Sequence, residues 1–236
     1  MVDIHSHILY DVDDGSKSIE ESIELLKKLR SVGFDKVILT PHYIYNDTYC
    51  VNNMDKLKKF NVLKEEIIKN NIDIDIYLGN EVFISTNIID NIKKGNIYTL
   101  NNSEYLLMEI PLHNKINNLL DIIYELKVSG CKVILAHPER YMCLQRDYKL
   151  IDDLKNDGVL FQCNYVSILG YYGKEAKKLF KYLLKKGYVD YLGTDIHRLS
   201  NTYVVDNFPK IEKNIIKIIG NDYYNKIKKN CINLIK

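Results

Sequence analysis

Several patterns are missing from this chain of 236 residues, and each absence excludes a class of protein. The five cysteines lie far apart and form no Cys-x-x-Cys pair, so neither a disulfide framework nor a thiolate zinc site is indicated. No apolar run approaches 18 residues, and the first residues lack a basic region followed by a long apolar stretch. We therefore expect a cytoplasmic protein without membrane insertion.

An excess of charge of one sign is also missing. The 33 basic and 31 acidic residues give a formal net charge of +2, and the lysines are spread along predicted helices. Nucleic acid and anionic membranes are therefore not expected as main partners. Hydrophobic residues make up 46% of the chain, enough for a sizeable core. Because no repeat, linker or shift in composition divides the sequence, we expect a single domain over residues 1–236.

Short apolar runs alternate with longer segments of helical periodicity. The runs predict seven strands, at residues 2–8, 36–40, 74–79, 104–110, 132–136, 159–164 and 189–195. Helices are predicted at residues 19–31, 54–70, 117–130 and 173–186, with two helical segments closing the chain. This alternation predicts an α/β fold with a parallel sheet and helices outside it. Seven strands favour a closed or nearly closed barrel over an open doubly wound sheet, with residues 41–54 as a loop over its mouth.

Histidine and carboxylate side chains gather at the carboxyl ends of these predicted strands. They are His5, His7, His42, Glu81, Glu109, His137, Asp195 and His197. Each one alone is a weak indication, because single histidines and glutamates usually belong to the core or to solvated loops. Placed together at six of the seven strand ends, the face where barrel active sites are built, they predict a metal site.

The chemistry of this ligand set points to hydrolysis. Imidazole and carboxylate without thiolate suit Mn, Fe or Zn, and Mg in part. The set exceeds the needs of one ion and is sufficient for two or three. A carboxylate such as Glu81 could bridge two ions about 3.5–4 Å apart, with a metal-activated water as the nucleophile.

Two arginines are candidates for the same mouth. Arg140 follows His137 by three residues, and its guanidinium could bind two phosphate oxygens as a fork. The alternative is a surface arginine that pairs with Glu139. Arg198, directly after His197, is the weaker second candidate.

Six segments of the chain together resemble the PHP (polymerase and histidinol phosphatase) superfamily. In order, they are DIHSHILYDVDDGSKSIEES, TPHY, GNEV, LLMEIP, LAHPERY and GTDIH. They are most similar to the bacterial protein-tyrosine phosphatases of capsule and exopolysaccharide loci, from residue 1 to about residue 200. This resemblance implies a distorted (β/α)7 TIM-like barrel, the PHP fold. It also implies metal-dependent hydrolysis of phosphotyrosine on the tail of a cognate tyrosine kinase that regulates polysaccharide synthesis.

The resemblance further implies ligand sets for three ions, usually Mn²⁺ in this branch. The first set is His5, His7, Glu81 and Asp195, the second Glu81, Glu109 and His137, and the third Asp14, His42 and His197. Of the other acids in the opening segment, Asp11 and Asp13 are expected to shape the loop or support ligands.

Arg140 matches an arginine implicated in substrate binding in the family. A second arginine usually follows the Asp-x-His motif by a few residues, but here Thr202 stands near that place and Arg198 comes earlier. Phe83 stands where an arginine or tyrosine is common. The resemblance therefore leaves Arg198 as the candidate replacement for the second arginine.

Other functions stay open at this point. Because no Cys-x5-Arg motif occurs, a phosphatase of this sequence would have to rely on metal. A small-molecule phosphoesterase, acting for example on histidinol phosphate or a nucleotide, predicts a deep pocket. A peptide substrate predicts an exposed mouth, with Tyr43, Tyr45 and Tyr49 nearby.

Two further classes are less favoured. An amidohydrolase is disfavoured because glutamates occupy the third and fourth strand ends, and a non-catalytic regulator that docks on a kinase is disfavoured by the complete ligand set. Tyr223, Tyr224 and the C-terminal helix are candidates for contact between copies of the chain, although a cover for the barrel is the simpler interpretation.

Overall fold

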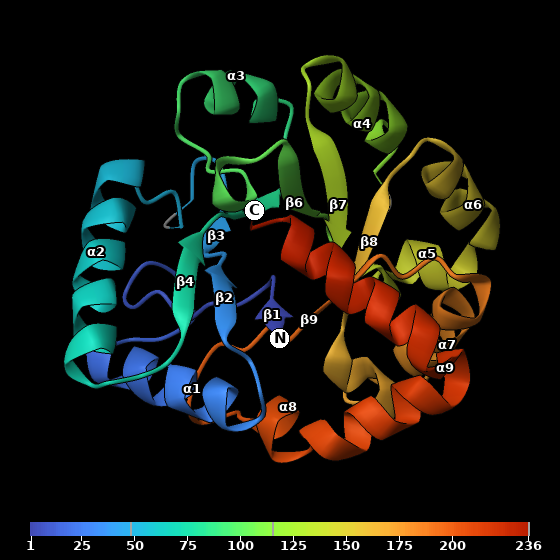
Figure 1. Ribbon diagram of the computed structural model, residues 1–236. Coiled ribbons are helices and arrows are strands. Elements are labelled where there is room, and N and C mark those ends of the chain that lie inside the picture. The colour runs from blue at the N-terminus through green and yellow to red at the C-terminus, as the bar shows by residue number, and fades with distance from the viewer. Residues whose placement is uncertain (48, 115, 236) are drawn as a thin grey trace.

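The computed structural model describes residues 1–47, 49–114 and 116–235. Its strands lie in a ring at the centre with helices around them (Figure 1). The strands are β1 (Val2–Asp3), β2 (Lys36–Leu39), β3 (His42–Tyr43), β4 (Asp75–Leu78), β5 (Glu81–Phe83), β6 (Tyr105–Glu109), β7 (Lys132–Ala136), β8 (Leu160–Asn164) and β9 (Tyr191–Gly193). All of their pairings are parallel, as the alternation of strands and helices predicted.

The helices follow the strands in chain order. They are α1 (Ile19–Ser31), α2 (Asn53–Lys69), α3 (Ile88–Lys93), α4 (Leu119–Val128), α5 (Met142–Arg146), α6 (Tyr148–Asn156), α7 (Lys174–Lys186), α8 (Tyr203–Asp206) and α9 (Phe208–Asn233). Three short 3₁₀ helices are η1 (Leu100–Asn102), η2 (Pro138–Arg140) and η3 (Tyr165–Leu169). The four predicted helices are confirmed within two residues at each end. In the described residues, no helix is both long and apolar enough to cross a membrane.

The second and third predicted strands, β2 and β4, are each followed after a break of two residues by a further short strand that was not predicted. Thr40 and Pro41 separate β2 from β3, and Gly79 and Asn80 separate β4 from β5. Pro41 has no N–H to donate to a neighbouring strand. The Asn80 side chain joins the two breaks, because its amide donates to the Pro41 carbonyl at 2.9 Å. Beyond the breaks, β3 pairs with β5 and sets His42 opposite Glu81.

A buried lysine supports this break. Lys56, on α2, donates from Nζ to the side-chain oxygen of Asn80 at 3.0 Å and lies over the rings of Tyr43 and Tyr98. Burial lowers the pKa of Lys56 to about 7. Hydrogen bonds with Pro41 and with Lys56 thereby hold Asn80 in place, directly before Glu81.

The first predicted strand is shorter than expected. Residues 2–8 were predicted, but β1 ends at Asp3. Beyond it, side chains replace some of the backbone hydrogen bonds between neighbouring strands. The Ser6 N–H donates to Thr40 Oγ1 at 3.1 Å. The Ser6 hydroxyl donates to the Ile38 carbonyl at 3.0 Å. His5 and His7 therefore lie past the end of a strand, held in an extended segment.

The strands form a distorted barrel with one weak seam. One sheet has the order β1-β2-β4 and the other β3-β5-β6-β7-β8-β9. A single bridge between Ser6 and Ile196 joins the first strand position to the last. Across the seam the Asp3 carboxylate accepts from both the N–H and the hydroxyl of Thr194. Burial raises the pKa of Asp3 to about 6, although these bonds oppose the shift.

The last helix covers the amino-terminal end of the barrel. α9 is interrupted at Gly220, whose φ of 75° lies in the left-handed region, so two helical segments close the chain as predicted. Cys231 belongs to the same buried cluster as Val2 and Tyr191, at the starts of β1 and β9. Tyr224 is buried and the Tyr223 hydroxyl donates to the Val189 carbonyl at 2.8 Å. Both tyrosines pack on the barrel, which agrees with a cover.

Candidate metal centre

Four buried side chains converge at the mouth of the barrel. His5 Nε2 lies 3.3 Å from His7 Nε2, 3.1 Å from Glu81 Oε2 and 3.5 Å from Asp195 Oδ1. His7 Nε2 lies 3.2 Å from the same Glu81 oxygen and 3.5 Å from the same Asp195 oxygen. Ligands about 2.1 Å from one ion are separated from each other by about 3.0–3.4 Å. The four atoms therefore have the spacing of ligands around a single cation.

Glu81 also faces two further histidines, His137 through its other oxygen and His42 through the same one. His137 Nε2 lies 2.8 Å from Glu81 Oε1. His42 Nδ1 lies 3.3 Å from Glu81 Oε2 and 3.0 Å from Glu109 Oε1. Glu81 is thus the carboxylate common to two sets of ligand atoms, at the position expected of a bridge.

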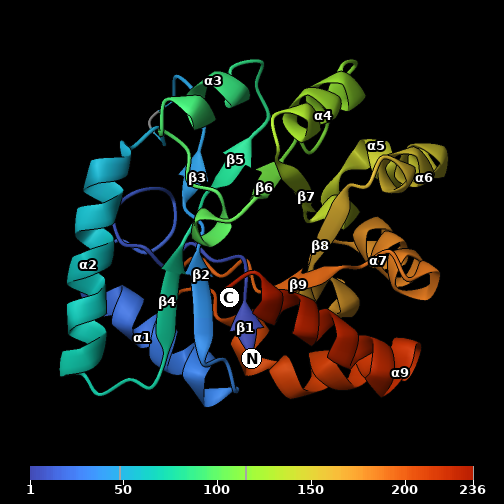
Figure 2. The same ribbon diagram turned by 45° about the horizontal axis from the view of Figure 1, so that its top comes forward.

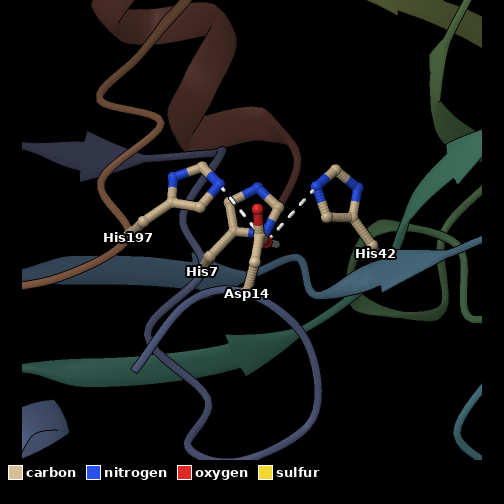
Figure 3. Close-up of side chains that lie close together, drawn as sticks. All are labelled: His7, Asp14, His42 and His197. Atoms are coloured by element: carbon tan, nitrogen blue, oxygen red, sulfur yellow. Dashed lines mark ion pairs between the residues drawn. The ribbon is translucent and has the colours of Figure 1, made fainter. Parts of the chain in front are cut away.

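A third group is more open to solvent. Asp14 Oδ1 lies 3.7 Å from Nε2 of both His42 and His197 (Figure 3). The rings of His7 and His197 stack with their centroids 3.9 Å apart. About half of the Asp14 side chain is exposed. His42 uses one ring nitrogen toward this group and the other toward Glu81 and Glu109, so it lies between two candidate sites.

The structure therefore brings all the sequence-predicted ligands together. They fall into four overlapping groups of possible ligand atoms: His7, Asp14, His42 and His197; His5, His7 and Glu81; His5, His137 and Asp195; and His42, Glu81 and Glu109. These groups differ from the sets that the resemblance implies: His42 joins Glu81 and Glu109, His137 groups with His5 and Asp195, and His7 also joins Asp14, His42 and His197.

The electrostatics of these groups fit a cation. Burial by itself would lower the pKa of His5, but attraction by Glu81 and Asp195 outweighs it and raises the pKa to about 9. Burial would raise the pKa of Glu81, yet attraction by His5 and His42 keeps it well below its usual range. The cluster thus holds ionised carboxylates out of water beside positively charged imidazoles, a place for positive charge that a metal cation can take.

Unpaired nitrogens give a second indication. The Nδ1 atoms of His42 and His137 are buried and have no hydrogen-bond partner within the described part of the chain. Buried polar atoms normally find a partner. His42 Nδ1 faces Glu109 and Glu81 without forming a hydrogen bond to either, as expected of a lone pair reserved for an ion. The donor set and these orphaned atoms fit divalent metal.

Two of the candidate ligands are among the residues with left-handed backbone conformation. His137 has φ 33° and Asp195 has φ 53°, both in the left-handed region that residues other than glycine rarely occupy. Each directly follows a strand or lies one residue beyond it. Such strain is typical of functional sites, where the surrounding structure holds a side chain in a required direction.

Asp13 supports His7 through the Nδ1 atom of its ring. Asp13 Oδ2 lies 2.7 Å from His7 Nδ1, and the carboxylate also accepts from the N–H groups of His42 and Gly15 at 2.9 Å. Burial would raise the pKa of Asp13, but the neighbouring histidines outweigh it and lower the pKa to about 2. A carboxylate on one ring nitrogen fixes the imidazole and leaves the other nitrogen for a metal.

Sequence reasoning missed a second supporting chain on β8. Gln162 Oε1 lies 2.8 Å from His5 Nδ1, and its amide donates to Asn164 Oδ1 at 2.9 Å. The Asn164 amide in turn donates to Asp195 Oδ2 at 2.7 Å. The available signal was two polar residues at alternate positions of an otherwise apolar run, which place both side chains on one face of the strand.

Gly15 allows the opening loop to close on His7. A Cβ atom at this position would lie 2.0 Å from the His7 carbonyl oxygen and 2.6 Å from the His7 Cβ. The Gly15→Ala variant is therefore expected to displace His7 and to retain less than about half of the Mn²⁺ of the wild type, because misplaced ligands lose affinity. Metal content after dialysis measures this.

The Gly130→Ala variant is the matched control for that substitution. Gly130 also has a positive φ but nothing within 4 Å of a Cβ. This variant is expected to lose about 1 kcal/mol of stability and no metal. Equal metal contents in the Gly15→Ala variant and the wild type would contradict the role given to the close approach.

The two predicted arginines differ in their placement. Arg140 Nη1 donates to Asp195 Oδ2 at 3.1 Å, and its guanidinium lies 4.4 Å from the centre of the Tyr172 ring. Burial would lower the pKa of Arg140, but Asp195 outweighs it and raises the pKa. Arg198 instead donates from Nε to the Asp14 carbonyl at 3.0 Å, on the outer side of the mouth. The hydroxyl of Thr202, directly before α8, donates a hydrogen bond to the carboxylate of Asp206, the last residue of α8.

An aromatic cavity of about 230 Å³ opens beside Arg140 and Asp195. Tyr171, Tyr172 and Tyr203 line it, with the rings of Tyr171 and Tyr203 5.2 Å apart. These tyrosines were not predicted, although the segment GYYG follows the sixth predicted strand after five intervening residues.

Of the three tyrosines that were predicted near the mouth, one stacks on a candidate ligand. Tyr43 is buried in the core and Tyr45 is exposed. Tyr49 alone reaches the site, stacked on His42 with the ring centroids 5.9 Å apart.

Comparison with known proteins shows the family of the chain. The family described as capsular polysaccharide synthesis, CpsB/CapC, matches residues 1–236. The chain belongs to the CpsB/CapC family. CapC of Staphylococcus aureus is 37% identical over 202 residues, which are 85% of this chain and 78% of that protein. The tyrosine-protein phosphatase CpsB of Streptococcus pneumoniae is 30% identical over 207 residues, 85% of this chain and 84% of that protein.

Solved structures of CpsB/CapC relatives share the fold. The crystal structures of YwqE from Bacillus subtilis and CpsB from Streptococcus pneumoniae, described as unique metal-dependent tyrosine phosphatases, include a chain that matches with a TM-score of 0.91 at 25% identity. That match covers 100% of this chain and 94% of the other. A phosphotriesterase homology protein from Escherichia coli matches with a TM-score of 0.59 at 14% identity, over 100% of this chain and 98% of that one, and shows the fold alone. The predicted resemblance is confirmed at the level of family and fold.

Proposed function

We propose that this CpsB/CapC member is a metal-dependent protein-tyrosine phosphatase. The observation that carries the proposal is the position of Glu81, whose two carboxylate oxygens lie within 3.3 Å of four imidazoles. Phosphate-binding and aromatic groups adjoin this cluster, in Arg140 and the tyrosine-lined cavity. The names of the CpsB and YwqE relatives support the same activity.

For the metals we propose the ligand sets that the resemblance implies. His5, His7, Glu81 and Asp195 would hold one ion, Glu81, Glu109 and His137 a second, and Asp14, His42 and His197 a third. The contacts of Glu81 with His5, His7 and His137, and of Asp14 with His42 and His197, support these sets. Nitrogen and oxygen ligands without thiolate favour Mn²⁺, with Fe, Zn or Mg as alternatives. When bound, such ions supply a water of lowered pKa and offset the charge on phosphoryl oxygens.

The remaining residues position the substrate. Arg140 would bind phosphate oxygens as a fork, held in place by Asp195 at one edge and by the Tyr172 ring on its face. The cavity beside it would receive the aromatic ring of the phosphotyrosine against the Tyr171, Tyr172 and Tyr203 side chains that line it. Because Tyr171 and Tyr203 are exposed, 45% and 37%, the mouth leaves room for a protein backbone to continue past the ring. This favours a phosphoprotein over a small metabolite.

A tyrosine kinase of capsule synthesis is the proposed partner. The family description and the resemblance support it, since a phosphatase of a polysaccharide locus needs a phosphotyrosine protein as its substrate. A small-molecule phosphoesterase is the second candidate. The two differ in how strongly they depend on the aromatic cavity.

Removal and return of metal tests the proposal. The chain is treated with a chelator, dialysed and supplied with Mn²⁺, Zn²⁺, Fe²⁺ or Mg²⁺ in parallel. Phosphate release is then measured from a phosphotyrosine peptide, the matching phosphoserine peptide, histidinol phosphate and a nucleotide. We expect activity to be lost on chelation and restored best by Mn²⁺, with kcat/KM for the phosphotyrosine peptide at least about tenfold above the others.

Each other outcome of that experiment has a definite meaning. Absence of metal-dependent phosphate release from every substrate would contradict the enzyme assignment. A preference for histidinol phosphate or the nucleotide would contradict the substrate while leaving the metal chemistry intact.

A further inference from the structure

Helix α7 carries an unusual concentration of positive charge. Its thirteen residues, KEAKKLFKYLLKK, include six lysines and only one acid, Glu175. The apolar positions of this helix, such as Leu179 and Leu183, face the core. The lysines therefore lie on the outer side, where they repel one another unless anions are near.

Part of this charge lines a groove against the neighbouring helix. α7 and α9 lie side by side in both views (Figures 1 and 2). A cavity of about 580 Å³ between them is lined by Lys177, Lys181, Lys185, Lys210 and Lys217. No carboxylate lines this cavity, and across the described residues none of these lysines forms an ion pair. Leu169 and Ile218 supply an apolar part of its wall.

The groove borders the aromatic cavity of the candidate active site. Tyr203 lines both the aromatic cavity beside Arg140 and the lysine-lined groove. Leu169 ends η3, which directly follows β8 at the carboxyl end of the barrel. A chain whose phosphotyrosine occupies the aromatic cavity can therefore pass over Tyr203 and enter the groove.

We propose that the α7–α9 groove binds an acidic segment of the phosphoprotein substrate, on one side of its phosphotyrosine. This inference rests on the proposed function and extends it to the sequence around the scissile residue. Carboxylate side chains would complement the unpaired lysines, while their alkyl parts and neighbouring apolar residues would contact Leu169 and Ile218. The groove is confined between two helices of a chain with a net charge of only +2, which suits a peptide better than a nucleic acid.

Two triple variants separate the groove from general charge. The groove variant is Lys181→Gln, Lys210→Gln and Lys217→Gln. The control variant is Lys213→Gln, Lys226→Gln and Lys229→Gln, which removes the same charge from exposed positions of α9 outside the groove lining. All five groove lysines but Lys177 are exposed, so the substitutions leave the core unchanged.

The variants are compared on three substrates with the Mn²⁺-loaded full chain. Two are phosphotyrosine peptides that differ only in their flanks, Asp and Glu in one and Asn and Gln in the other, with each flank tested separately. The third is p-nitrophenyl phosphate, which is too small to reach the groove. We expect the wild type to have about a tenfold lower KM for one acidic-flank peptide, a difference that shrinks with added salt.

The groove variant is expected to lose this difference, whereas the control variant keeps it. Equal KM values for acidic and neutral peptides in the wild type, or equal losses in both variants, would overturn the inference. Tighter groove-dependent binding of a 20-nucleotide single-stranded DNA than of the acidic peptide would also overturn it. If the wild type hydrolyses neither peptide nor p-nitrophenyl phosphate, the proposed function itself is wrong, and the two failures are thus distinguishable.

Discussion

Phosphate release from a phosphotyrosine peptide is expected to fall by at least about a thousandfold when Glu81 is replaced by glutamine. Glu81 is 1% exposed, and its oxygens face His5, His7, His42 and His137. An amide removes the negative charge and sets N–H donors where metal ions require lone pairs. The variant is therefore expected to bind less metal, which is measured as Mn²⁺ per chain alongside kcat.

The matched control for Glu81 is a surface glutamate. Glu104 pairs with Lys132 at 2.5 Å, and about half of each side chain is exposed. The Glu104→Gln variant should keep its activity and metal content, because exposed ion pairs contribute little. A Glu81→Gln variant with full Mn²⁺ occupancy and more than about a tenth of wild-type activity would refute the bridging role.

The Arg140→Ala variant is expected to lower kcat/KM by about 10²- to 10³-fold, the range typical for loss of one charge-stabilising group. Its metal content should stay unchanged, because Asp195 keeps the hydrogen bond from Asn164 at 2.7 Å. The loss then reflects substrate phosphate that is no longer held by the guanidinium. Steady-state kinetics with a phosphotyrosine peptide and a metal assay on the same preparation measure both quantities.

Two further substitutions make this result specific. Arg140→Lys retains the charge but not the fork or the stacking on Tyr172, and an intermediate activity is expected. Arg198→Ala should cost less than about tenfold, because Arg198 is bonded to the Asp14 carbonyl on the outer side of the mouth. Normal activity of Arg140→Ala would remove its assigned role, and a larger loss at Arg198 would exchange the two assignments.

Much of the fold could be predicted because apolar periodicity is a local property. The helix at residues 19–31 and the strand at residues 132–136 have the predicted bounds, and both are set by their own side-chain patterns. The breaks after Leu39 and Leu78 could not be predicted in this way. They depend on hydrogen bonds from Asn80 to Pro41 and from Lys56 to Asn80, between residues far apart in the sequence.

The candidate ligands were predictable for a different reason. Parallel strands bring their carboxyl ends to one face, so position at a strand end is enough to bring His5 and Asp195 together. The residues that orient them were not predictable from position alone. Gln162 and Asn164 have their roles only because β8 lies beside β9 in the closed ring. The tyrosines of the aromatic cavity depend likewise on how η3 and α8 fold over the mouth.

The seam between β1 and β9 has a consequence for how the protein is made. Translation produces His5 and His7 first and Asp195 and His197 almost 200 residues later. A nascent chain can fold its early strands, but the proposed first ligand set is complete only when Thr194 reaches Asp3 and Ile196 reaches Ser6. With the proposed ligands, metal loading would wait for the completed barrel. Bound ions would then link the two ends of the fold, so that opening the seam and losing metal would be a single event.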